Sequence, residues 1–157
     1  MRIFEAILWS FAALMGNASA DAPAPRIEGQ WTTEYRIVDV TNATVTDRNR
    51  LKALKMWIGH RYGARNCVEA GDASNLLQST YPYDPAARSS VKFNENGGFT
   101  ATSRYSGGFA IPGRGKETIV GVVDGDHLEG VVDIELDWEG GTHIRAVLVA
   151  TRSGPCK

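Results

Sequence analysis

The sequence predicts an all-β protein, in which an antiparallel meander of about seven strands curls into a barrel or half-barrel with one or two short helices alongside. Three observations support this prediction. Residues 128–139 alternate between apolar and mainly acidic side chains, and further strand-like runs follow along the chain. In addition, the 17 glycines among many β-forming residues indicate turns rather than disorder.

The C-terminal part of the chain contains the clearest strands. Over residues 128–139, one face takes apolar residues that end at Trp138, and the other face takes mainly acids. Successive side chains of a strand leave opposite faces, so this period of two predicts a half-buried strand. Residues 143–152 alternate in the same way. Residues 118–123 form a third run, joined through the Asp-Gly-Asp hairpin signal at 124–126, whose register stays open.

Register decides the length of the turn that follows residue 139. A two-residue Gly140-Gly141 loop would mix apolar and polar side chains on each face. Adding Thr142 to the loop sets Trp138 opposite Ile144 and keeps the faces separate, which predicts an odd-length loop of three or five residues with a bulge. On the polar face, the same register pairs Asp137 with Arg145 and Glu139 with His143.

Residues 1–20 have the features of a cleavable export signal. Arg2 gives a short basic start, residues 6–15 are mostly apolar, and small residues end the segment at Ala20. The apolar run is too short to span a bilayer. The alternative is an N-terminal helix that the mature protein keeps. The expected organisation is a signal over 1–20, a flexible leader over 21–28 and a single β-rich domain over 29–157, in a periplasmic or secreted protein cleaved near Ala20.

The overall charge argues against two classes of partner. With 17 basic and 18 acidic residues, the formal net charge is −1. The chain as a whole therefore has no basic surplus for nucleic acid or an anionic membrane. No nucleic-acid partner, transmembrane span or cofactor is expected.

The first strand is predicted over residues 29–38, where Trp31 and Tyr35 share a face with other apolar or β-branched residues. Residues 66–77 form a short polar stretch with helical character after Cys67. Prolines then require a loop over 81–85. The remaining predicted elements are a hairpin of 90–93 with 99–105 around the turn 94–98, and a Gly/Pro-rich loop over 106–115.

Residues 47–60 are the clearest helix candidate. Asp47 can cap this helix, and Leu51, Leu54 and Ile58 recur at helical spacing. As an amphipathic basic helix it could contact a membrane or an acidic partner. The alternative, which its few turns favour, is a solvated face on a helix packed against the barrel. The basic residues are Arg48, Arg50, Lys52, Lys55 and Arg61, and Met56 and Trp57 widen the apolar face.

The chain contains two cysteines, Cys67 and Cys156. In an exported protein such a pair is expected to form a disulfide. This bond would close a loop of about 90 residues and contribute roughly 4–5 kcal/mol in the chain-entropy account. The alternatives are two unpaired thiols or a metal pair, although two cysteines alone make a poor zinc site.

Several short motifs point to a family. Gly29-x-Trp31 opens the first strand, and an acidic, Ala-rich stretch follows Cys67 (CVEAGDASNLL). A late strand pair (IVGVVDGDHLEGVVDIEL) precedes the ending Arg-Ser-Gly-Pro-Cys156. Most of the chain from residue 29 to 156 resembles the small exported Gram-negative proteins called domain of unknown function 3617. The resemblance lies in these motifs, in their order and in their spacing.

Two departures from that family matter. The family often has a second, inner cysteine pair around residues 91–105, and both of those cysteines are absent here. The resemblance therefore implies that Cys67 and Cys156 are the outer pair. The basic helix at 47–60 lies where the family usually has a shorter, extended segment. The family has no established activity, so the resemblance implies no catalytic residue.

No catalytic or metal motif is visible in the sequence. No serine lies in a Gly-x-Ser-x-Gly elbow, and no glycine-rich phosphate loop leads from a strand into a helix. His127 follows two aspartates in a turn, but the spacing of known calcium loops is not met, so a solvent-exposed hairpin turn is predicted. We expect no catalytic residue and no metal ligand.

The sequence favours two binding functions over an enzymatic function, because no pair of nucleophile and base is visible. The first is a non-enzymatic periplasmic protein that binds a small apolar ligand or an envelope component. Its ligand-lining or core residues would be Trp31, Tyr35, Phe99, Tyr105 and Trp138. The second is a protein-interaction or inhibitor module that uses loop 105–115 and helix 47–60. Its loop residues would be Phe109, Ile111 and Arg114, unless Phe109 and Ile111 plug the barrel end.

We expect the mature chain, purified from the periplasm without denaturation, to begin near Asp21 and to weigh two hydrogens less than the reduced chain. Native mass spectrometry measures both properties. A discrete added mass that is lost on organic extraction would favour ligand binding, and a bare mass would favour a protein-binding surface. The mass of the fully reduced chain would contradict the disulfide.

Overall fold

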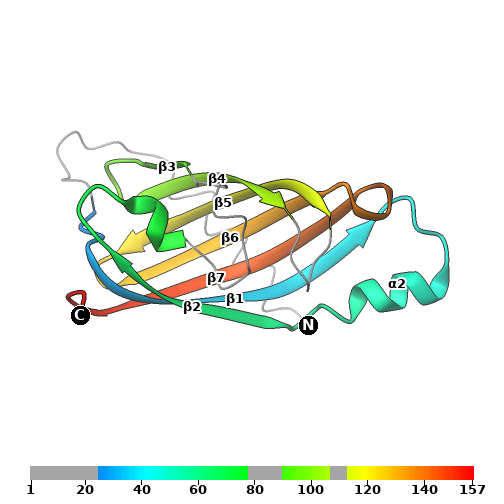
Figure 1. Cartoon of the computed structure of the whole chain (residues 1–157), viewed down its shortest axis with the longest axis horizontal. Helices are drawn as coiled ribbons and strands as arrows, with labels where there is room; N and C mark the ends of the chain where they lie inside the picture. Colours follow the sequence, from blue (N-terminus) through cyan, green and yellow to red (C-terminus); the bar gives the residue numbers. More distant parts are fainter. Residues whose placement is uncertain (1–24, 78–89, 107–112) are drawn as a thin grey trace.

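The computed structural model describes residues 25–77, 90–106 and 113–157, so the predicted export signal lies outside the described residues. One antiparallel sheet of seven strands, in the order β2-β1-β7-β6-β5-β4-β3, curls into a half-barrel (Figure 1). This confirms the predicted all-β fold. The elements are β1 (Gly29–Asn42), α2 (Arg48–Lys55), β2 (Arg61–Val68), the 3₁₀ turn η1 (Ala73–Leu77), β3 (Ser90–Phe93), β4 (Gly98–Ser106), β5 (Arg114–Asp124), β6 (His127–Leu136), the 3₁₀ turn η2 (Trp138–Gly140) and β7 (Thr142–Gly154).

The meander runs from β3 to β7, and the N-terminal pair β1–β2 extends the sheet beyond β7. The first and last strands are therefore neighbours, paired from Gln30 opposite Gly154 to Asn42 opposite Thr142. After β2 the chain passes through η1, which contacts β1, β2 and β3. Because β2 and β3 are the two edges of the sheet, η1 lies across the open side of the half-barrel.

The inner face of the sheet carries the predicted apolar side chains. Along β1, β6 and β7 the buried residues alternate with exposed ones, as the period of two predicts. Leu76 and Leu77 of η1 are also buried and pack with these side chains in one core. Full burial of a Leu or Ile side chain contributes about 1.5–3 kcal/mol, so this shared core is the main source of stability.

Strand β2 is the element that the sequence pattern does not predict. Its residues, RYGARNCV, show no clear alternation, and only Val68 is fully buried. An edge strand pairs on one side, so its inward positions are less completely covered than those of a central strand. Its conformation is supported by the ladder with β1, which runs from Gly29 opposite Val68 to Arg36 opposite Arg61.

The predicted helix over 47–60 is shorter than expected. Asp47 caps α2 as predicted, but α2 ends at Lys55 and turns carry the chain to Gly59. Gly59 has a φ of 91° and donates its backbone N–H to the carbonyl of Ile37. This turn directs the chain into β2. It also removes Ile58 from the apolar face that a longer helix would have given it, and Ile58 is exposed.

The β6–β7 loop has five residues, 137–141, so the predicted odd length is confirmed. The register derived from a three-residue loop is wrong, because Ile134 rather than Trp138 lies opposite Ile144. The predicted bulge is absent from this ladder, and the register shifts lie in β1 instead. The hydroxyl of Thr142 is buried and donates to the carbonyl of Trp138 at 2.9 Å, which closes the longer loop.

The changed register also changes the predicted ion pairs. Asp133, not Asp137, lies opposite Arg145, and its carboxylate accepts from the Arg145 Nε at 3.0 Å. The same carboxylate oxygen lies 3.1 Å from His143 Nε2. Glu139 instead pairs with Arg50 of α2 at 2.9 Å. At the other end of β6, the open register of the 124–126 hairpin is settled with Asp124 opposite His127.

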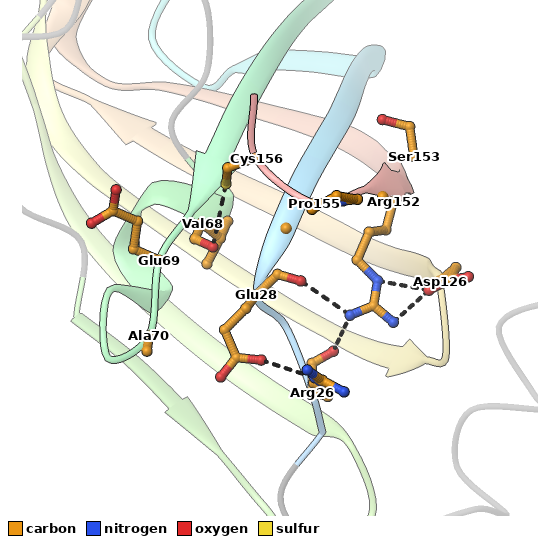
Figure 2. A pocket seen from close by; sticks show the side chains of 12 residues that line it. Arg26, Glu28, Val68, Glu69, Ala70, Asp126, Arg152, Ser153, Pro155 and Cys156 are labelled. Carbon is orange, nitrogen blue, oxygen red and sulfur yellow. Dashed lines mark hydrogen bonds and ion pairs between the residues drawn. The ribbon is translucent and has the colours of Figure 1, made fainter.

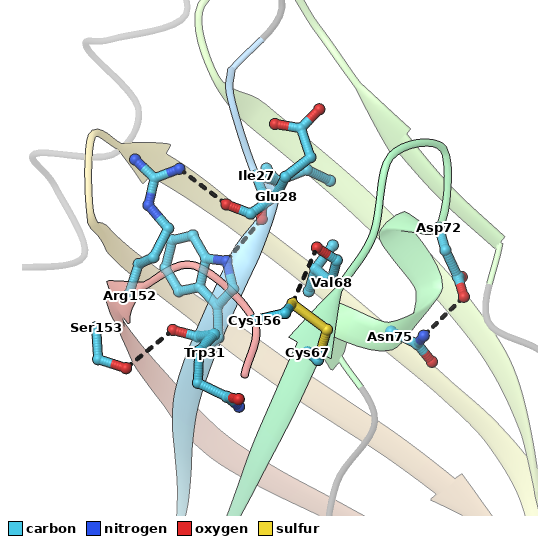
Figure 3. The surroundings of a disulfide bond; sticks show 11 residues. Ile27, Glu28, Trp31, Cys67, Val68, Asp72, Asn75, Arg152, Ser153 and Cys156 are labelled. Carbon is cyan, nitrogen blue, oxygen red and sulfur yellow. Dashed lines mark hydrogen bonds between the residues drawn. A yellow bond between two sulfur atoms is a disulfide. The ribbon is translucent and has the colours of Figure 1, made fainter.

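The predicted disulfide between Cys67 and Cys156 is present, with 5.4 Å between the two Cα atoms (Figure 3). It joins the end of β2 to the segment after β7, across a sequence separation of 89 residues. Since β1 lies between β2 and β7, the bond staples three neighbouring strands at one end of the half-barrel.

We expect the double variant Cys67→Ala/Cys156→Ala to unfold at a lower denaturant concentration than the oxidised protein, with a loss of about 2–5 kcal/mol. The bond closes a long loop and so restricts the conformations of the unfolded chain, and the variant lacks this restriction. Equilibrium urea unfolding measures the difference. An equal midpoint for the double variant and the oxidised protein would contradict a stabilising role.

Candidate functional site

Three regions of the described residues combine chemistry-bearing side chains: a polar cluster on the inner face, a groove beside the disulfide, and the end of the half-barrel that carries α2. The first is centred on Glu117 of β5, which is only 3% exposed. The hydroxyl of Ser103 on β4 donates to its carboxylate at 3.1 Å. A buried carboxylate is costly without hydrogen bonds, so this contact is part of what keeps Glu117 inside.

Tyr35 completes the inner polar cluster. Its hydroxyl donates to the carbonyl of Leu77 at 2.9 Å and so ties β1 to η1. Burial raises the pKa of Tyr35 well above its usual value, and the negative charge of Glu117 raises it further. The phenol therefore stays protonated and acts as a donor. The sequence pattern gives no sign that Glu117 is buried, because it precedes a run that is apolar on both faces.

The five residues predicted as ligand-lining or core do not form one wall. Trp31, Tyr35 and Phe99 are buried in the core. Trp138 lies in the β6–β7 loop and is half-buried. Tyr105 belongs to β4, but its side chain lies outside the described part of the structure.

A groove of about 810 Å³ lies beside the disulfide, between the segment before β1 and the end of β7 (Figure 2). Four of its five charged groups contact one another: Arg26 pairs with Glu28, and Arg152 pairs with Asp126, while Glu69 is the fifth. The groove consequently presents no dominant charge and does not indicate one chemical class of ligand. The residues that line it are Arg26, Glu28, Gly29, Val68, Glu69, Ala70, Asp126, Arg152, Ser153, Gly154, Pro155 and Cys156.

Arg152 has a structural role in this groove. Its Nη1 donates to the carbonyls of Arg26 and Glu28, both at 3.1 Å, and its Nε donates to Asp126 at 2.6 Å. Its guanidinium carbon lies 5.7 Å from the centroid of the Trp31 ring, which favours a cation–π contact. Figure 2 shows Arg152 with Arg26, Glu28 and Asp126, and Figure 3 shows it with Trp31 beside the disulfide. Arg152 thus joins β7, the β5–β6 turn and the segment that leads into β1.

The third region is the end of the half-barrel opposite the disulfide, where α2 projects from the sheet (Figure 1). Asp47 accepts hydrogen bonds from the backbone N–H groups of Asn49 and Arg50, both at 2.9 Å, and so fixes the start of α2. Leu54 is buried against the core. Trp57 stacks on Trp138, with 5.2 Å between ring centroids and 19° between ring planes.

The β6–β7 loop is the attachment point for two predicted interaction elements. Glu139 pairs with Arg50 of α2, and Asp137 accepts the backbone N–H of Arg114 at 2.7 Å. Helix 47–60 and the C-terminal end of loop 105–115 therefore meet at one end of the half-barrel. Arg114 is exposed at the start of β5, whereas Phe109 and Ile111 lie outside the described residues.

All charged side chains of α2 are cations. Arg48, Lys52 and Lys55 follow one another at spacings of four and three residues and thus share one helix face. Within the described ranges none of these three has an ion-pair partner. Like charges at these spacings destabilise a helix by about 0.2–0.5 kcal/mol per pair, whereas the position of Lys52 and Lys55 in the last turn is favoured by the helix dipole.

Two large apolar side chains adjoin this cationic row. Met56 is 69% exposed and Ile58 is 41% exposed, immediately after the last turn of α2. We call the surface formed by Arg48, Lys52, Lys55, Met56 and Ile58 the docking end. Its underside is held by Leu54 and Trp57, so the exposed groups lie on an anchored element.

Within the described residues, no group of three or more His, Cys, Asp or Glu side chains is placed to hold a metal ion. None of the helices in the same ranges is long and apolar enough to cross a membrane. The chain matches no protein-family model, and neither a curated protein nor a solved structure matches it. The family resemblance therefore stays a prediction that rests on the sequence motifs.

We expect Tyr35→Phe to lower the free energy of unfolding by about 1 kcal/mol at neutral pH, because the Leu77 carbonyl loses its donor. The pKa of Tyr35 is raised in the folded protein, so the unfolded state ionises first as the pH passes about 10 and the folded state loses stability. The Tyr35→Phe variant does not lose stability in this way, because Phe has no hydroxyl that ionises.

The stability difference between the wild-type protein and Tyr35→Phe should therefore shrink as the pH rises above about 10. Urea unfolding at neutral and alkaline pH measures this difference. A difference that stays constant across this range would contradict the raised pKa.

Proposed function

We propose that this chain is a non-enzymatic binding protein of the cell envelope, which attaches to an envelope partner through the docking end. The single observation that carries this proposal is a cationic row that has no ion-pair partner in the described part of the chain, next to exposed Met56 and Ile58 on one anchored element. The envelope location rests on the predicted export signal and is supported by the disulfide, which persists in oxidising compartments.

The anchoring of the docking end supports a binding role. Asp47 caps the start of α2, and Arg50 and Trp57 hold it to the β6–β7 loop. A surface that is already ordered loses less conformational entropy on binding than a mobile segment does. The exposed apolar side chains would then bury surface against the partner with little loss of conformational entropy.

A second candidate function is the binding of a small amphiphilic ligand at the inner face. The observation that favours it is the Ser103–Glu117 pair, a buried polar pair on a mainly apolar inner face. Ligand sites commonly combine apolar walls with a few placed polar groups. The added mass sought in the native mass spectrum distinguishes this function from surface docking.

The proposal predicts that removing the three cations of α2 releases the protein from the envelope. The α2-neutral variant carries Arg48→Gln, Lys52→Gln and Lys55→Gln, which replace good helix formers with another good helix former. Washed envelopes from cells that export the variant are expected to retain less of it than of the wild-type protein.

A matched control separates the docking end from net charge. The strand-neutral variant carries Arg65→Gln, Lys92→Gln and Arg104→Gln, which remove three exposed cations from β2, β3 and β4. It should be retained like the wild-type protein, and both variants should change stability by no more than about 0.5 kcal/mol. Equal release of both variants, or of neither, would contradict the proposal.

A further inference from the structure

We infer that the partner of the docking end is an anionic lipid surface, an inference that rests on the proposed function and specifies its partner. The chain as a whole has a net charge of −1, so attraction to anionic lipid has to be local. The cationic row of α2 supplies such a local charge, and the exposed Met56 and Ile58 supply the apolar contact.

The length and orientation of α2 argue against a protein groove. A helix that binds in a groove presents a row of apolar anchors at spacings of three, four and seven residues. In α2, Leu54 is buried and Leu51 is half-buried, so the helix presents no row of exposed apolar anchors. What remains outside is a cationic row with two apolar side chains at its end, which suits a flat surface.

The surrounding acids only partly offset the cationic row. Glu139 is ion-paired with Arg50. Asp47 and Asp137 accept from neutral backbone N–H groups and so keep their negative charges. Arg48, Lys52 and Lys55 outnumber these two acids, and none of the three pairs with an acid among the described residues.

The side chains also have the reach that a lipid interface requires. Lys and Arg extend charged groups to the phosphates while their aliphatic stems lie on apolar surface. Met56 and Ile58 follow the cations directly and would enter the boundary between headgroups and acyl chains. Trp57 lies between them in the sequence, is half-buried and stacks on Trp138.

Such binding would orient the protein. The α2 end and the C-terminal disulfide end lie at opposite ends of the long axis of the half-barrel (Figure 1). With the docking end on the lipid, the groove beside Cys156 would point away from the membrane. Either end could then function without blocking the other.

The inference is tested with the purified, oxidised protein and vesicles of two compositions. One set contains equal parts of phosphatidylglycerol and phosphatidylcholine, and the other contains phosphatidylcholine alone. Co-sedimentation measures the partition constant at low salt and at about 0.15 M salt, where exposed charges are screened beyond about 8 Å. The wild-type protein should bind the anionic vesicles, more weakly at the higher salt, and should not bind the neutral ones.

The α2-neutral variant should lose about 100-fold in partition constant, because each cation near an anionic surface contributes about fivefold. The strand-neutral variant should bind like the wild-type protein. A third variant, Met56→Ser/Ile58→Ser, keeps every charge and should bind more weakly at both salt concentrations. Circular dichroism of each variant verifies that it is folded.

The outcomes separate the lipid inference from the proposed function. No binding to anionic vesicles, combined with in-cell cross-linking to an acidic protein that requires the α2 cations, would overturn the lipid inference and leave the docking end in place. Equal vesicle binding by the α2-neutral and strand-neutral variants would also overturn it, since net charge would then explain the attraction. If neither vesicle binding nor cross-linking depends on α2, both proposals are wrong.

Discussion

The pairing of β1 with β7 is the constraint on which the rest of the structure depends. It joins the first and last strands of the fold over nearly the whole length of each. Without this pairing, β1 and β2 would have no sheet to extend, and the inner face would lose Trp31 and Tyr35. The disulfide and Arg152 reinforce the same junction at one end. There, Cys67 and Cys156 connect β2 to the segment after β7, and these two strands lie on either side of β1. Long-range pairing of this kind becomes stable only when both strands bury side chains on a common face.

The two ends of the half-barrel consequently differ in character. At the disulfide end, the charged groups of Arg26, Glu28, Asp126 and Arg152 contact one another and stabilise the fold. At the α2 end, the contacts hold the underside of the helix, and the cationic row has no ion-pair partner among the described residues. This asymmetry directs the functional proposal to the α2 end, because cations without an ion-pair partner among the described residues are available to an external partner.

The face assignment of the strands could be predicted from sequence, since alternation between Leu128 and Leu136 is a local property of the chain. The cap at Asp47 and the basic character of α2 were predictable for the same reason. The sequence did not predict β2, because its residues do not alternate between polar and apolar. It also did not predict that Glu117 points inward, because the free-energy cost of burying this carboxylate depends on its hydrogen bond with Ser103, a residue on another strand. The length of the β6–β7 loop was predicted only as odd, because both odd lengths keep the same faces.

By itself, the sequence determined the strand periodicity, the helix cap and the two cysteines available for a disulfide, because each is set by residues close together or by their number. The tertiary structure alone decided that β1 joins β7, that Trp57 stacks on Trp138, and that α2 ends early enough to leave Met56 and Ile58 exposed. These features depend on contacts between residues far apart in the chain. Local periodicity carries no information about which distant partner a face will meet, and that partner decides which side chains remain on the surface.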